Sequence, residues 1–104
     1  MSKEHKLEME ILSGPLDGHV VSLQAEAEWT AAGSGLLAFP WDDELGEPQA
    51  RLTPDEHGWG LESRKSPHGT YRINREEKVQ GRIQLEKGDV LKASNTWLLI
   101  HRLD

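Results

Sequence analysis

Residues 59–71 read WGLESRKSPHGTY, a strand-like segment followed by a polar turn and the start of a second strand. A strand-like segment, Trp59–Ser63, leads through polar and turn-forming residues to a second strand-like segment that begins at Thr70. IQLEKGDVL at residues 83–91 and SNTW at residues 94–97 follow in the same manner, each combining short apolar segments with turn residues. This order of strand, polar turn and strand predicts antiparallel β-structure.

The rest of the chain extends the pattern. Lys6–Ile11 alternates apolar and polar residues with a period of two, which is typical of a strand with one buried face. Turn residues at 13–18 separate it from a second strand, His19–Leu23, so the chain is expected to open with a hairpin. Further strands are predicted at residues 28–31, 36–39, 50–53, 59–63, 70–73, 78–80, 82–85, 89–93 and 96–102.

About ten or eleven short strands with turns roughly every 8–12 residues predict an all-β sandwich of two sheets. We expect no helix longer than about two turns. Alternation and position near strand centres predict a buried core made of Leu7, Met9, Ile11, Val21, Leu52, Trp59, Leu61, Leu85, Val90, Leu98 and Ile100.

Length and composition limit the possible classes of protein. A chain of 104 residues is the size of one domain, so we expect residues 1–104 to form a single domain. A domain of this size would also be suitable as one module of a longer protein. The absence of cysteine excludes a disulfide scaffold, a cysteine-ligated zinc site and a thiol nucleophile. No apolar run approaches the roughly 20 residues of a membrane-spanning helix, and we expect a cytoplasmic setting without membrane insertion.

Motifs for catalysis and for cofactor binding are missing from the sequence. It has no nucleophile elbow, no P-loop and no dinucleotide fingerprint, and its five histidines are scattered. We therefore predict no enzyme activity, no cofactor and no metal site. The acidic run Asp42-Asp43-Glu44 is interpreted as a solvated loop rather than as a pair of catalytic carboxylates or a Ca²⁺ site.

Charge is distributed unevenly along the chain. Residues 1–57 carry three Lys or Arg and 12 Asp or Glu, a sum of −9, whereas residues 58–104 carry nine and six, a sum of +3. The total of −6 argues against nucleic-acid binding, which needs a basic face. The two halves predict either separate acidic and basic patches or a solvated surface of mixed charge.

In this order the segments resemble a forkhead-associated (FHA) domain. Ser66-Pro67-His68-Gly69-Thr70 is similar to the Ser-x-Asn-Gly-Thr loop of that family with one departure, and Leu85–Asp89 matches its Leu-x-x-Gly-Asp motif fully. The resemblance spans roughly Leu7 to Arg102. It implies a SMAD/FHA-type β-sandwich that binds phosphothreonine peptides on loops at one end.

The chain departs from the family at the positions that bind phosphate. The family's first arginine is expected near residues 31–34, where the sequence has neither Arg nor Lys. The family's serine, the arginine after it, the histidine and the asparagine correspond to Gly46, Glu47, Gln49 and His68. A phosphate needs cationic and hydrogen-bond-donating partners, and only Ser66, Gly69 and Thr70 persist.

The resemblance and its departures together imply a non-catalytic protein–protein interaction module that does not depend on phosphate. One alternative is a phosphothreonine reader that uses the loop Arg64–Thr70, where Arg64, Lys65 and a protonated His68 would partly replace the missing arginine. Another is a structural or oligomerisation sandwich that pairs through an edge strand. The candidate partner-binding residues are Trp41, Gly46, Glu47, Gln49, Arg64, Lys65, Ser66, His68, Gly69 and Thr70.

Overall fold

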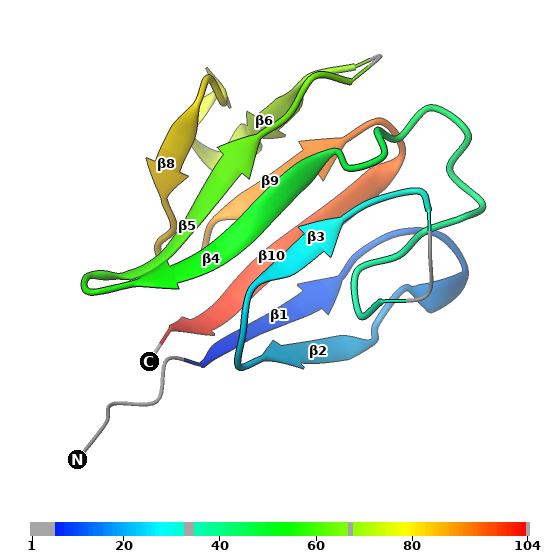
Figure 1. Ribbon diagram of the computed structural model, residues 1–104. Helices are drawn as coiled ribbons and strands as arrows, with labels where there is room; N and C mark the ends of the chain where they lie inside the picture. The colour runs from blue at the N-terminus through cyan, green and yellow to red at the C-terminus, as the bar shows by residue number, and fades with distance from the viewer. Residues whose placement is uncertain (1–5, 33–34, 67, 104) are drawn as a thin grey trace.

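Strand formation follows the alternation of the sequence. The computed structural model describes residues 6–32, 35–66 and 68–103, and these residues form ten named strands (Figure 1). Two short 3₁₀ turns, Gly14–Leu16 and Ile73–Arg75, are the helical elements of the described residues. The strands are β1 (Leu7–Ile11), β2 (Val20–Leu23), β3 (Ala27–Trp29), β4 (Ala50–Asp55), β5 (Gly58–Ser63), β6 (Thr70–Arg72), β7 (Glu77–Lys78), β8 (Arg82–Gln84), β9 (Val90–Ala93) and β10 (Thr96–Leu103).

The strands form two antiparallel sheets. One sheet has six strands in the order β2-β1-β10-β9-β6-β7, and the other has four in the order β3-β4-β5-β8. The opening hairpin β1–β2 pairs Met9 with Val21, as the alternation of the first segment predicts. The predicted all-β sandwich of two sheets is therefore confirmed.

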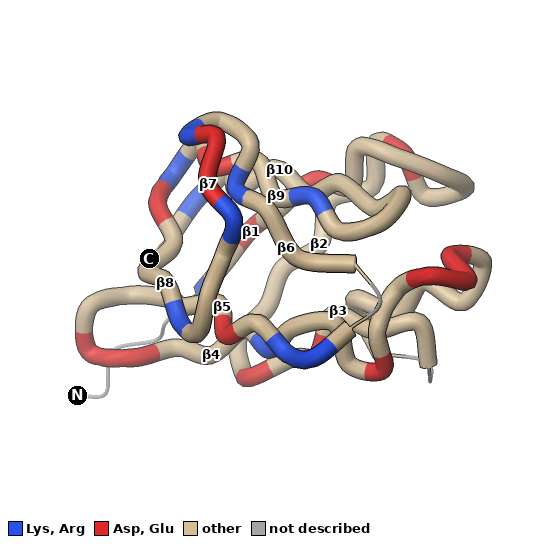
Figure 2. The backbone as a smooth tube through the Cα atoms, turned by 90° about the horizontal axis from the view of Figure 1, so that it is seen from above, with Lys and Arg blue, Asp and Glu red and all other residues tan. Residues whose placement is uncertain are grey.

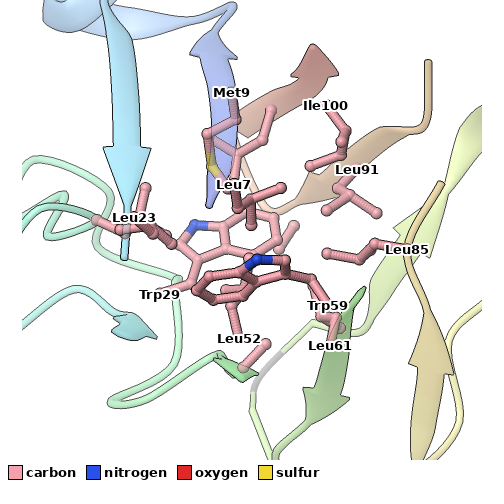
Figure 3. Close-up of a cluster of buried hydrophobic side chains, with 14 of the residues drawn as sticks. Leu7, Met9, Leu23, Trp29, Leu52, Trp59, Leu61, Leu85, Leu91 and Ile100 are labelled. Atoms are coloured by element: carbon pink, nitrogen blue, oxygen red, sulfur yellow. The ribbon is translucent and has the colours of Figure 1, made fainter. Parts of the chain in front are cut away.

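The core lies between the two sheets. Trp29 of β3 and Trp59 of β5 lie within it, surrounded by leucines, isoleucine and methionine from both sheets (Figure 3). The predicted core is confirmed except at Val21 and Val90, which are only half-buried. Val21 lies on the edge strand β2, and Val90 faces outward because its neighbour Leu91 is the residue that points into the core.

The apolar segment Leu36–Phe39 does not form the predicted strand. Its backbone makes only an isolated parallel bridge, between Ala38 and Thr30. Leu37 and Phe39 are nevertheless buried, so this run contributes side chains to the core from within a long connection. Gly33 and Ser34, part of the expected arginine region, lie outside the described residues, as does Pro67.

The Leu-x-x-Gly-Asp motif forms a polar cluster between β8 and β9. Asp89 is buried and accepts hydrogen bonds from Arg72 Nη1 at 3.1 Å, from Asn74 Nδ2 at 3.1 Å and from the backbone N–H of Glu86 at 2.9 Å. Arg72, also buried, donates a further bond to Glu77 at 2.8 Å. Because each buried charge has an opposite partner and hydrogen bonds, the cluster joins β6, β7 and β9 without leaving a charge unpaired.

Four of the connections between strands gather at one end of the sandwich. The β1–β2, β3–β4, β5–β6 and β9–β10 connections lie at the end opposite the two termini (Figure 1). No helix in the described part of the chain is long and apolar enough to cross a membrane. The predicted binding residues on the β3–β4 and β5–β6 connections therefore share one end of the molecule.

We expect Leu85→Ala to lower the free energy of unfolding by about 2–5 kcal/mol, because the substitution leaves a cavity at a buried site. The matched control is Leu36→Ala, since Leu36 is 62% exposed and its truncation should change stability by no more than about 0.5 kcal/mol. Urea unfolding followed by tryptophan fluorescence measures both values. Equal losses in the two variants would contradict the core described here.

Candidate functional site

A buried amide connects the two loops that the sequence singles out. Gln49, just before β4, is 0% exposed. Its Nε2 donates hydrogen bonds to the carbonyl oxygen of His68 at 3.0 Å and to Thr70 Oγ1 at 2.9 Å. Its Oε1 accepts a bond from the backbone N–H of Gly46 at 2.8 Å. The Gln49 side chain thus joins the β3–β4 loop to the β5–β6 loop and brings four of the candidate residues together.

Gly46 lies directly against Ser66. A Cβ atom at Gly46 would lie 2.8 Å from Ser66 Cβ, 3.0 Å from Gln49 Cα and 3.0 Å from the carbonyl oxygen of Pro48. These distances are shorter than side-chain carbons tolerate, and two of the three neighbours are backbone atoms that cannot swing aside. A hydroxyl-bearing residue does not fit at this position without a shift of the loops.

The polar side chains of the β5–β6 loop form hydrogen bonds to other groups of the two loops. Ser66 Oγ donates a hydrogen bond to the carbonyl oxygen of His68. The exposed imidazole of His68 hydrogen-bonds through Nε2 to Glu44 Oε2 at 2.8 Å. Thr70 is fully buried, so its hydroxyl does not face a ligand at the surface. Of these residues, Thr70 has a structural role in the loop.

The two basic residues at the start of this loop differ in their surroundings. Arg64 Nη2 lies 2.8 Å from Glu62 Oε1, so its charge already has a partner. Lys65 is exposed, and Glu47 on the facing loop is exposed as well. The loop end therefore presents carboxylates beside its cations.

Asp42 corrects the interpretation of the acidic run as a solvated loop. Its side chain is buried and accepts hydrogen bonds from Ser94 Oγ at 2.7 Å, Thr96 Oγ1 at 2.9 Å, the Asn95 N–H at 3.0 Å and the Glu44 N–H at 3.3 Å. Burial opposes ionisation of the carboxyl group, but the four hydrogen bonds outweigh it and lower the pKa of Asp42. Asp42 thereby holds the β3–β4 loop to the β9–β10 turn, whereas Asp43 and Glu44 are exposed as predicted.

Trp41 lies beside the β1–β2 connection. It is 41% exposed, and its ring meets Phe39 edge-on with the ring centroids 5.7 Å apart. A Cβ atom at Gly14 would lie 2.9 Å from Trp41 Nε1, so the indole covers the backbone of that turn. Trp29, by contrast, is a core residue. The assignment of Trp41 as a partner-binding residue remains a prediction.

A groove of about 390 Å³ lies next to these loops, and three of its lining residues lie on the six-stranded sheet and were not among the predicted site residues. Tyr71 of β6, Lys78 of β7 and Lys92 of β9 form its sheet side, and two predicted site residues, His68 and Gly69, also line it. Strand periodicity could have indicated that Tyr71 points outward, but the pairing of β6 with β7 and β9 is not visible in the sequence. The remaining lining residues are Glu44, Ser94 and Asn95.

Within residues 6–32, 35–66 and 68–103, no three His, Asp or Glu side chains gather as metal ligands. The site is therefore described by its loops, its groove and its charges.

No protein family model and no curated protein matches this chain. Solved structures do match it. An FHA domain of a hypothetical protein from Arabidopsis thaliana has a TM-score of 0.81 at 18% identity, with 97% of this chain and 91% of that chain covered. An FHA domain from a study of phosphothreonine-dependent FHA interactions has a TM-score of 0.78 at 17% identity, with 93% and 96% covered.

The FHA domain of FhaA, in complex with the intracellular domain of Rv3910, has a TM-score of 0.72 at 17% identity and covers 93% of this chain and 99% of its own. Sequence identities this low concern the fold alone. The chain has the fold of FHA domains.

We expect Gly46→Ala to destabilise the domain by about 1–3 kcal/mol, because the new methyl group would overlap Ser66 and the adjacent backbone. Gly35→Ala is the control, since a Cβ atom there meets no atom within 4 Å and the substitution should be neutral or stabilising by up to about 1 kcal/mol. Thermal or urea unfolding measures both. A neutral Gly46→Ala variant would show that the loops are further apart than described.

Asp42 gives a pH-dependent prediction. Because its pKa in the folded state lies below the ordinary value of 3.8, the stability contributed by the ionised carboxylate is complete above that pH and is lost as the pH falls. We expect Asp42→Asn to lower the free energy of unfolding by about 1–3 kcal/mol at pH 7. At pH 3 we expect this difference between the variant and the original protein to be smaller. Urea midpoints at the two pH values measure it. The exposed neighbour provides the control, since Asp43→Asn should stay within about 0.5 kcal/mol of the original protein at both.

Proposed function

We propose that this FHA-fold domain is a non-catalytic interaction module that binds a protein or peptide partner without depending on phosphothreonine. The observation that carries the proposal is the packing of Gly46 against Ser66, which leaves no room for a side-chain donor at that position. A protein partner is supported by the complex of the similarly folded FhaA domain with the intracellular domain of Rv3910.

The electrostatics of the loop end also disfavour a phosphate. A phosphothreonine carries a charge of about −1.5 to −2 and needs positively charged donors in fixed positions. Residues 31–34 contain no Arg or Lys, and Glu44 and Glu47 are exposed on the β3–β4 loop. A phosphate at this loop would therefore face two exposed carboxylates.

The free energy of the missing contacts is large enough to determine the affinity for phosphate. A hydrogen bond to a charged group contributes about 1.5–3 kcal/mol. The loss of the arginine and of the serine hydroxyl therefore removes about 4 kcal/mol, which corresponds to about a thousandfold in the dissociation constant.

The alternative is a phosphothreonine reader built on Arg64, Lys65 and His68. Two of these three groups are engaged in the described structure, since Arg64 is paired with Glu62 and His68 with Glu44. Both pairs would have to break before the side chains could bind phosphate. The third group, Lys65, is exposed. A single exposed ionic contact contributes only about 0–1 kcal/mol to binding.

We expect phosphothreonine peptides to bind no more tightly than about 1 mM, with unphosphorylated peptides binding about equally, because the loop end lacks a preorganised cationic pocket. A phosphopeptide library measured by isothermal titration calorimetry at pH 7.5 tests this. A micromolar hit that requires the phosphate and disappears in Ser66→Ala and Arg64→Gln, but not in Lys87→Gln, would establish the alternative instead.

A further inference from the structure

The outer faces of the two sheets carry charge in different ways. On the four-stranded sheet, Glu28 lies opposite Arg51, Arg51 opposite Glu62, and Glu62 opposite Arg82. The signs alternate across β3, β4, β5 and β8, and Arg51 Nη2 lies 3.3 Å from Glu28 Oε2. Opposite charges directly across a strand pair stabilise each other, so this face neutralises its own charges.

The outer face of the six-stranded sheet has a different row near the loop end. Tyr71 of β6 lies opposite Lys78 of β7 on one side and opposite Lys92 of β9 on the other, and Lys92 lies opposite Trp97 of β10. We call these four residues the lysine–aromatic row. Figure 2 shows the two basic segments on β7 and β9. The row contains two cations and no carboxylate.

The two lysines of the row carry uncompensated charge. Among the residues that the structure describes, neither Lys78 nor Lys92 makes an ion pair, although Arg64 and His68 at the same end both do. Lys92 Nζ lies 5.5 Å from the centroid of the Trp97 ring, a cation–π contact that holds the ammonium group near the surface of the sheet. Tyr71, between the lysines, is 39% exposed.

The spacing of the row fits an extended acidic segment. Neighbouring strands lie about 4.8 Å apart, so the two lysines stand about 10 Å apart at the backbone. Alternate residues of an extended chain lie about 7 Å apart on one face, within the reach of two long lysine side chains. The groove of about 390 Å³ beside the row is concave, so it suits a narrow segment better than a flat anionic surface. Glu44, which also lines the groove, is paired with His68.

We propose that the lysine–aromatic row is the docking site for a carboxylate-rich, extended segment of a partner protein. Two carboxylates of that segment, two residues apart and therefore on the same face, pair with Lys78 and Lys92 on either side of Tyr71. The inference rests on the proposed function, because it names the partner chemistry of an interaction module, but it places the contact on the sheet face rather than on Gly46 and Ser66.

The test uses a defined probe, a capped peptide of about eight residues that alternates Asp with Leu, and the same peptide with Asn in place of Asp. We expect the Asp peptide to bind at least tenfold more tightly than the Asn peptide, with backbone amide shifts in β6, β7 and β9. Lys78→Gln combined with Lys92→Gln should weaken binding by about tenfold. The control pairs Lys6→Gln with Lys87→Gln, two exposed lysines away from the row, and should change affinity less than about twofold.

Three outcomes would overturn the inference: equal affinity for the Asp and Asn peptides, equal effects of the two double variants, or binding to phosphatidylserine vesicles in place of the peptide. Tighter binding of a phosphothreonine peptide at the row would also overturn it, since the proposed ligand is a carboxylate. The proposed function is decided separately by Ser66→Ala and Arg64→Gln, so a failed acidic peptide leaves phosphate independence standing. If a peptide binds only when phosphorylated and no longer binds these two variants, the proposed phosphate independence is wrong. The docking site at the row would then still be decided by the acidic peptide.

Discussion

The buried amide of Gln49 is the constraint on which the arrangement of the loop end depends. A buried amide with unmet hydrogen bonds costs about 1–3 kcal/mol, and here both ends of the amide are satisfied by backbone and side-chain groups of two loops. The loops therefore cannot separate without exposing or orphaning this group. The close contact of Gly46 with Ser66 follows from that coupling, and Asp42 makes an equivalent connection to the β9–β10 turn.

Much of the fold could be predicted from the sequence because the strands follow simple periodicity. Lys6–Ile11 alternates without interruption, and β1 forms there with its apolar side chains in the core. Leu36–Phe39 misled the prediction because an apolar run indicates burial but not whether its backbone joins a sheet. Val90 was misassigned because two adjacent apolar residues do not reveal which of them faces inward, and Leu91 does.

The candidate site was predictable in its loops and not in its long-range contacts. The resemblance to FHA domains grouped Gly46, Gln49, His68 and Thr70, and they do lie together. The burial of Asp42 was missed because its partners lie in the β9–β10 turn, more than fifty residues later. The lysine–aromatic row was missed for the same physical reason, since Tyr71 and Lys92 become neighbours only through the register of β6 with β9.

The lysine–aromatic row and the close packing of Gly46 against Ser66 are connected through the short strand β6. Gln49 holds Thr70 on the inner side of that strand, where its side chain is fully buried. Successive side chains of a strand point to opposite faces, so an inward Thr70 requires an outward Tyr71. The hydrogen bond from Gln49 to Thr70 is therefore consistent with an outward Tyr71 between Lys78 and Lys92. In this way the amide that joins the two loops also supports the proposed docking site on the sheet.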